Sequence, residues 1–335
     1  MRISRRALAA SGIAAAALIV VVIAVVLVTR PRTSKPPGPV PTARPSTAGL
    51  TSPFTGEPVS ALGPELIFKI DNVPQARPPT GLGAADIVYL IPVEGGLSRI
   101  MAVFSAHIPP VVGPVRSARE DDIELLRQFG RPAFAFSGAQ PRLLPVVEHA
   151  RIVDLYSGIT PGYFRSTTRI APYNLYARTA TLLAQAKGAS TARDIGFRFG
   201  PRPAGGTPTG AFRISYPAAG FAFTWSAGQH RWLVTMDGKA AAAASGRRLG
   251  GPTVVIQYVK VSTSGFLERG SRPPYAQTVG KGDAVVLRDG RAYHVHWSRP
   301  AADGGTTFTL PDGRRMPFAR GQVWVVLAYG PGSTG

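Results

Sequence analysis

Residues 7–28, ALAASGIAAAALIVVVIAVVLV, form a run of 22 residues without a charged side chain, and Ser11 is its only polar one. A helix that spans a bilayer needs about 20 such residues. A cleaved signal peptide has a shorter apolar region and a cleavage site between small residues, and the VVLVTRPR that ends this run offers no such site. The run therefore predicts an uncleaved transmembrane signal anchor over residues 7–28, behind a cytoplasmic tail of residues 1–6.

The orientation of this anchor follows from size rather than from charge. Three arginines precede the apolar run and three basic residues follow it (Arg2, Arg5 and Arg6; Arg30, Arg32 and Lys35). The positive charges on the two sides of the run are therefore nearly equal, and the positive-inside rule does not decide the orientation. Because the leading tail is very short and the body is large, we expect the body outside the cell membrane. The alternative is a cytoplasmic body behind a membrane tail.

Residues 29–52 are rich in Pro, Thr and Ser and contain almost no large apolar side chain. Such a composition predicts an extended linker between the membrane and the body. The formal charge of the whole chain is +20, and residues 1–52 contribute seven basic and no acidic side chains, which leaves +13 for the rest. This charge suits an anionic partner, and for an extracytoplasmic body we expect an envelope component and no nucleic acid.

The body divides into two patterns. Residues 53–200 alternate apolar runs typical of strands (65–70, 86–93, 98–106 and 132–137) with helical patterns (117–130, 139–150 and 174–187). This predicts an N-terminal domain of the α+β or α/β class with a central mixed sheet. After a turn-rich boundary at 192–210, residues 210–330 show only short β-type runs separated by glycine turns. They predict a smaller, mostly-β C-terminal domain.

Several chemistries find no support in the sequence. The chain has no cysteine, which excludes disulfides, thiolate metal sites and a lipidated cysteine. The TGLGAAD stretch at 80–86 follows no strand pattern and opens no long helix, so it is a poor dinucleotide fingerprint. His294 and His296 lack a third zinc ligand, and no serine elbow accompanies the histidines. We therefore expect no serine-type hydrolase.

Arginines at the predicted helix start form the first candidate site. In VVGPVRSARED, Ser117 and Glu120 have the spacing of a capping box, with Ser117 as N-cap. Arg116 and Arg119 flank that start, where positive charge opposes the helix dipole. An anion held by the two guanidinium groups and the free helix amides would explain their presence.

Two further stretches carry candidate residues. YFRSTTRIAPYNLYART at 163–179 places Arg165, Arg169 and Asn174 among aromatic rings, and Arg99 follows a glycine turn in the stretch 83–104. Arg99, Arg165 and Arg169 are expected to surround the anion. An alternative is structural, in which the arginines pair with acids and hold the domain together (Glu94, Glu120 and Asp121).

The blocks IDNVPQARPPTGLGAADIVYLIPVEGGLSRIMAVF, GPVRSARED and FRSTTRIAPYNLY resemble the YerB-like family of bacterial envelope lipoproteins, a domain of unknown function with N- and C-terminal parts. The resemblance covers nearly all of 53–330 and implies an envelope location. Two departures are visible: the chain has no lipobox cysteine, and Tyr173 stands where the family pattern suggests histidine.

A fainter similarity links Asp86, the two following strands and the turn before Arg116 to glycopolymer transferases of the LytR-CpsA-Psr type. That resemblance implies a phosphotransferase in which Asp86 holds Mg²⁺, although the chain lacks the Arg-Ser-Asp triplet of those enzymes. No cofactor is expected otherwise.

The sequence therefore predicts a membrane-anchored extracytoplasmic protein that binds a phosphate-bearing or lipid-linked glycopolymer. The rival expectations are an accessory module that docks on a cell-wall synthesis protein through its β domain, and the phosphotransferase.

Overall fold

The computed structural model describes residues 49–268 and 270–333. The predicted anchor at 7–28, the tail at 1–6 and most of the linker lie outside the described residues. Within the described part of the chain, no helix has the length and apolar character needed to cross a bilayer.

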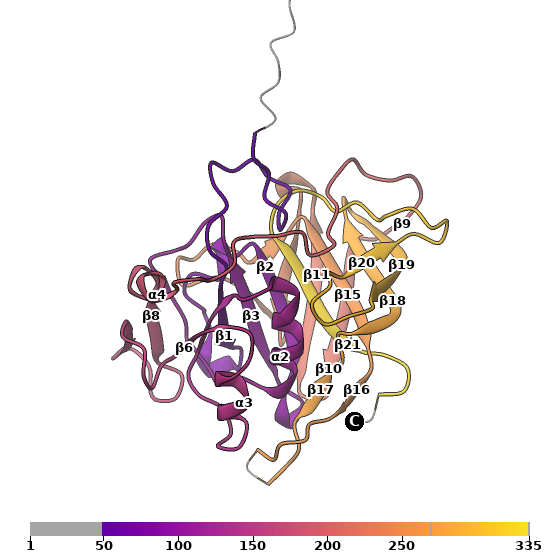
Figure 1. Cartoon of the computed structure of the whole chain (residues 1–335). Coiled ribbons are helices and arrows are strands. Elements are labelled where there is room, and N and C mark those ends of the chain that lie inside the picture. The colour runs from indigo at the N-terminus through magenta and orange to yellow at the C-terminus, as the bar shows by residue number, and fades with distance from the viewer. Residues whose placement is uncertain (1–48, 269, 334–335) are drawn as a thin grey trace, which may run out of the picture. The chain divides into compact units, whose positions relative to one another are not determined.

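A mixed sheet of eleven strands is the main element of the body (Figure 1). Its strand order is β20-β19-β18-β15-β21-β2-β3-β1-β5-β6, and β9 pairs with β19. Five strands come from the N-terminal half: β1 Leu66–Asp71, β2 Ile87–Pro92, β3 Ser98–Phe104, β5 Ala133–Phe136 and β6 Val153–Tyr156. Six come from the C-terminal half: β9 Thr207–Pro208, β15 Thr253–Val259, β18 Gly280–Arg288, β19 Arg291–Arg299, β20 Thr307–Thr309 and β21 Val323–Tyr329. The predicted mixed central sheet is confirmed.

Strand β21 joins the two halves of the chain. It runs parallel to β2, with Ile87 opposite Val323, and parallel to β15 on its other side, with Thr253 opposite the same residue. The two domains expected from the sequence thus share one continuous sheet. Every residue of β1, β2 and β3 is buried, which is typical of a sheet that is covered on both faces.

Three smaller sheets are entirely antiparallel. The first contains β10 Ala211–Tyr216, β11 Ala219–Ser226, β12 Arg231–Met236, β13 Lys239–Ala240 and β14 Gly250–Gly251. The second pairs β16 Val261–Thr263 with β17 Pro274–Ala276, and the third contains β4 Val111–Val112, β7 Tyr163–Arg165 and β8 Leu175–Arg178. In the described residues after Gln185 there is no α-helix, so the predicted β character of the C-terminal half is confirmed.

Alternation along the central strands creates two hydrophobic clusters. Phe68 and Val88 belong to the cluster that includes Phe223 and Trp232 of the five-stranded sheet. Their apolar neighbours in sequence belong to the cluster that includes residues of α2 and Phe129 of the turn after it. Successive side chains of a strand point to opposite faces, so the apolar runs cover both faces of the sheet.

The helices are fewer and shorter than the sequence suggests. They are α2 Glu120–Leu126, α3 Leu144–Glu148 and α4 Thr179–Gln185, with 3₁₀ turns at Pro74–Ala76, Leu82–Ala84, Glu94–Gly96, Arg127–Phe129 and Ala227–Gln229. The predicted helix over 174–187 is wrong in its first part, because residues 175–178 form β8 and pair with both β4 and β7. The predicted helix over 139–150 is reduced to α3. In both cases tertiary contacts override local propensity.

The predicted capping box is also wrong. The N-cap of α2 is Arg119, two residues later than the predicted Ser117. The carboxylate of Asp122 accepts the Arg119 backbone N–H at 2.7 Å and lies 2.5 Å from the Lys69 ammonium, whose side chain is fully buried. This buried ion pair joins α2 to β1, and the same Asp122 carboxylate caps the Arg119 N–H at the start of the helix.

Glu65 provides a stability test of the core beside β1. Burial raises the pKa of its carboxyl group from 4.5 to about 8, against the opposing charge and backbone N–H of Arg193. Between pH 4.5 and about pH 8, the Glu65 carboxyl group is ionised in the unfolded chain but not in the folded one. The free energy of unfolding of the wild type therefore falls as pH rises, by about 1.4 kcal/mol for each pH unit. We expect the free energy of unfolding of Glu65→Gln, measured by chemical unfolding, to rise relative to that of the wild type as pH increases across this range. Glu148→Gln, at a partly exposed carboxylate, is the control, and an unchanged difference across the range would contradict the prediction.

Candidate functional site

Three arginines meet in one cleft of about 420 Å³. Arg99 lies on β3, while Arg116 and Arg119 lie on the segment that leads into α2. Asp71, at the end of β1, is the register partner of Arg99. We call this site the arginine cleft; it is also lined by Glu94, Ser98, Ser117, Tyr173, Glu268 and Ser271.

Glu94 holds two of the three arginines. One of its carboxylate oxygens accepts from Arg99 Nη2 at 2.8 Å and also from Arg119 Nη2, and the other accepts from Arg119 Nε at 2.8 Å. A tight turn presents this carboxylate, and the two glycines that follow Glu94 both have positive φ, a conformation that glycine adopts at little cost. Arg99 and Arg119 are thereby fixed in position, and both side chains are almost fully buried.

The pKa values of Glu94 and Arg99 reflect the burial and the charges around them. Burial alone would raise the pKa of Glu94, but the hydrogen bond from Arg119 and the charges of Arg99 and Arg119 outweigh it and hold the pKa at about 2. For Arg99, burial and then the charge of Arg119 lower the pKa to about 10, although Glu94 and Asp71 oppose this. Burial is therefore the main reason for the low pKa of Arg99, and the charge of Arg119 adds to it.

Arg116 is the most open of the three arginines. Its side chain is 21% exposed, and its Nε lies 2.8 Å from Asp71 Oδ2. Among the described residues no hydrogen bond is made by its two terminal nitrogens. Two N–H-bearing atoms of a guanidinium are thus available in the cleft, and such a planar pair suits the oxygens of a phosphate.

The structure separates the other predicted residues from this cleft. Arg165 donates to the Asn174 side chain at 2.8 Å, and Asn174 donates to the Ser166 carbonyl. Arg169 donates to the carbonyls of Ala76 and Pro78 at 2.6 and 2.7 Å. Arg165 and Asn174 order their own loop, and Arg169 connects it to residues 76–78. From the segment 163–179 only Tyr173 lines the cleft.

The structural alternative in the sequence analysis named Glu94, which does pair with Arg99 and Arg119, but the analysis missed Asp71, Asp122 and Lys69. Lys69 and Asp71 stand in and just after the apolar run ELIFKI, and Asp122 lies in the acidic run after Arg119. A charged side chain within a fully buried strand needs a partner. Lys69 inside that run was the one signal that could have pointed to the ion pair.

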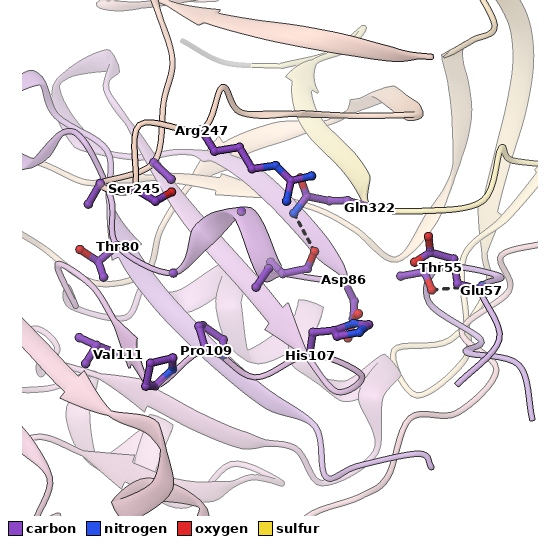
Figure 2. A pocket seen from close by; sticks show the side chains of 17 residues that line it. Thr55, Glu57, Thr80, Asp86, His107, Pro109, Val111, Ser245, Arg247 and Gln322 are labelled. Atoms are coloured by element: carbon purple, nitrogen blue, oxygen red, sulfur yellow. Dashed lines mark hydrogen bonds between the residues drawn. The ribbon is translucent and has the colours of Figure 1, made fainter. Parts of the chain in front are cut away.

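Asp86 lines a different cavity, of about 660 Å³ (Figure 2). It immediately precedes β2 and is 2% exposed. Its Oδ2 accepts the backbone N–H groups of Ser105 at 2.6 Å and Ala106 at 3.1 Å. Burial raises its pKa to about 6, while these two N–H groups and the nearby His107 partly oppose the rise.

The predicted magnesium role does not fit this cavity. Mg²⁺ takes an octahedral shell of oxygens, but one oxygen of Asp86 is committed to backbone amides, and Glu57 offers the only other carboxylate in the lining. Over the described residues, no group of three or more His, Asp or Glu side chains is placed to hold a metal ion. No lining residue is shared by the two cavities.

Family models match both halves of the chain. The N-terminal domain of "Protein of unknown function (DUF3048)" matches residues 50–192, and the corresponding C-terminal domain matches residues 212–325. The chain belongs to the DUF3048 family. The expected resemblance is confirmed, and the arginine cleft draws Arg99, Arg116 and Arg119 from the first of these two regions.

A relative and a solved structure extend this result. The chain is 26% identical over 310 residues to "Putative lipoprotein YerB" of Bacillus subtilis strain 168, covering 85% of this DUF3048 chain and 86% of the relative. The crystal structure of YerB from Bacillus subtilis matches with a TM-score of 0.70 at 20% identity, over 83% of this chain and 96% of that chain. At that identity the structural likeness shows a shared fold.

Glu94 yields a second prediction. Removing one partner of a buried ion pair costs about 3–5 kcal/mol, and Glu94→Gln leaves two buried guanidinium groups without their shared carboxylate. We expect a loss of that order in the free energy of unfolding at neutral pH, measured by urea titration. Asp312→Asn is the matched control because its pair with Arg314 is exposed, and it should leave stability nearly unchanged.

The same carboxylate has a defined pH signature. Its pKa is depressed from 4.5 to about 2, so its contribution is complete above about pH 4.5 and is lost as pH falls toward 2. The stability difference between wild type and Glu94→Gln should shrink over that interval. A difference that stays constant would show that Glu94 acts through packing instead.

Proposed function

We propose that this protein is a membrane-anchored, extracytoplasmic envelope protein that binds a phosphate-bearing envelope component in the arginine cleft. The observation that carries the proposal is the state of Arg116, whose terminal nitrogens face a cleft in which Glu94 already fixes Arg99 and Arg119. A ligand anion would bind to guanidinium groups that need little reordering. Preorganisation of this kind favours affinity.

The cleft is lined by three guanidinium groups and three carboxylates, so an anionic ligand depends on the unpaired nitrogens of Arg116 rather than on a net positive charge. Three guanidinium groups face Glu94 and Asp71, and the next carboxylate, that of Glu268, lies 3.9 Å from Arg119. A bound anion would lie beside Glu268 or replace it as a partner of Arg119. Burial, and after it the charge of Arg119, lowers the pKa of Arg99, and a phosphate oxygen nearby would favour the charged guanidinium.

The ligand contacts differ from those expected at first. Free amides at the start of α2 are not part of the proposal, because the Arg119 N–H binds Asp122 and the first turn carries three acids. Arg165, Arg169 and Asn174 are likewise placed outside the binding group. The ligand would contact Arg116 directly, with Arg99 and Arg119 held behind it by Glu94.

An envelope location is supported by two independent features. The apolar run at 7–28 has the length and composition of a membrane anchor, and the relative from Bacillus subtilis carries the word lipoprotein in its name. Because this chain has no cysteine, we propose that the apolar segment replaces a lipid as the anchor. Phosphate-bearing or lipid-linked glycopolymers are ligands that such a body could reach.

The rival functions have weaker support. A phosphotransferase would need Asp86 next to the arginines, whereas Asp86 lines the other cavity. Docking on a cell-wall synthesis protein through the β half would favour exposed apolar side chains there. Of the large ones in the described residues, Leu50, Val146, Ile159 and Ile170 precede residue 210 and only Leu267 follows it.

Ligand-dependent unfolding of the full-length chain in neutral detergent tests the proposal. Inorganic pyrophosphate and farnesyl pyrophosphate are the two probes, since they separate a free phosphate from a lipid-linked one. A ligand at 100 times its dissociation constant stabilises the folded state by about 2.7 kcal/mol. We expect a rise in Tm for the wild type that is absent in Arg116→Ala and retained in Arg165→Ala.

Each variant is compared with its own ligand-free state, so a change in basal stability does not affect the conclusion. Arg116→Gln replaces Arg116→Ala if the smaller side chain prevents folding. An equal shift in wild type and Arg116→Ala would move the site away from the arginine cleft. No shift with either probe at millimolar concentration would overturn phosphate binding and favour the protein-partner function.

A further inference from the structure

The Asp86 cavity is assembled from both halves of the chain and is held open by backbone contacts. The loop before β14 is tied to the N-terminal half by the Ala244 N–H, which donates to the Pro79 carbonyl at 2.9 Å. The Gln322 side-chain amide donates to the carbonyls of Leu82 and Ala85 at 3.2 and 2.7 Å, and its oxygen accepts from Trp324. The walls are therefore ordered without a ligand.

Asp86 lies in the floor of this cavity with one oxygen uncommitted. Oδ2 accepts two backbone N–H groups, whereas Oδ1 makes no hydrogen bond within the described residues. Figure 2 shows the carboxylate next to the His107 ring. A carboxylate that is 2% exposed and half satisfied has a strong need for a donor or a cation.

The rim carries charges of both signs. Glu57 and His107 are exposed on the side of the N-terminal half, and Arg247 is exposed on the loop of the C-terminal half. In Figure 2 the Arg247 side chain extends toward Gln322. A chain with a charge of +20 thus places two carboxylates and one guanidinium around this cavity.

The remaining walls are small and aliphatic. Gly81, Gly83, Ala84, Ala85, Pro109 and Ala243 are among the lining residues, and no Phe, Tyr or Trp is found in the lining from the described residues. Gly81 has φ +81, and a Cβ there would lie 2.6 Å from the Val111 carbonyl oxygen. The cavity lacks the aromatic platform that stacks on sugar rings or bases.

We propose that the Asp86 cavity is a second ligand site that binds a short peptide of small residues through its free ends, the ammonium group at Asp86 and Glu57 and the carboxylate at Arg247. A volume of about 660 Å³ lies in the range of ordinary ligand pockets and exceeds what a single small amino acid needs. This inference does not rest on phosphate binding, because the two cavities share no lining residue.

Calorimetric titration of the full-length chain in neutral detergent tests the inference. Trialanine is the probe, with N-acetyl-trialanine lacking the ammonium group, trialanine amide lacking the carboxylate, and alanine lacking the length. We expect binding of trialanine to be at least about tenfold tighter than that of any of the three analogues, which corresponds to about 1.4 kcal/mol.

Two variants assign the ends of the peptide. Asp86→Asn keeps an oxygen for the N–H groups of Ser105 and Ala106 and should fold, yet it should bind trialanine about tenfold more weakly. Arg247→Ala should weaken the binding of trialanine. It should leave the binding of trialanine amide, which is already weak, unchanged. Asp312→Asn and Arg314→Ala, at an exposed ion pair, are the controls and should bind like the wild type.

A pH series adds an independent readout. The pKa of Asp86 is about 6, and Glu57 and His107 are the other titratable groups that face it. Affinity should therefore fall between about pH 7 and pH 5 in the wild type and change less in Asp86→Asn. Equal affinity for N-acetyl-trialanine, wild-type affinity in Asp86→Asn, or no binding heat at millimolar trialanine would each overturn the inference.

Discussion

The parallel pairing of β21 with β2 is the contact on which the rest of the body depends. It brings the last strand of the chain against a strand of the N-terminal half, with Ile87 opposite Val323. At the start of this pairing, the Val323 N–H donates to the Asp86 carbonyl at 3.0 Å, and the Gln322 side chain donates to the Ala85 carbonyl. One strand pairing therefore completes the central sheet and forms a wall of the Asp86 cavity.

Buried charged side chains connect β1, α2 and the arginine cleft in the N-terminal half. Lys69 and Asp122 connect β1 to α2, and the Arg119 N–H that binds Asp122 belongs to the residue whose side chain reaches Glu94. A charge is tolerated inside a protein only when it is paired and hydrogen-bonded. These pairs constrain one another, so the position of α2 and the positions of the cleft arginines are determined together.

The two cavities differ in the way they use charge. In the arginine cleft, Arg99 and Arg119 are paired with Glu94, and the more exposed Arg116 is free at its terminal nitrogens within the described chain. In the other cavity, Asp86 is buried and carries the available oxygen. Under the two proposals, the same body would use a guanidinium group in one cavity and a carboxylate in the other to recognise its ligands.

Local sequence determined the strands of the N-terminal half, the β character of the C-terminal half and the family, because apolar runs, glycine turns and motif order are local features. It also singled out Arg99, Arg116 and Arg119. It also offered Glu94, Glu120 and Asp121 as possible partners of these arginines. Only the tertiary structure decided that Glu94 and Asp71 are the acids that pair with them, that helix α2 starts after Arg119, and that β21 lies against β2. Ion pairs and strand partners depend on distance in space, and residues far apart in the chain carry no local signal of the partner that folding brings to them.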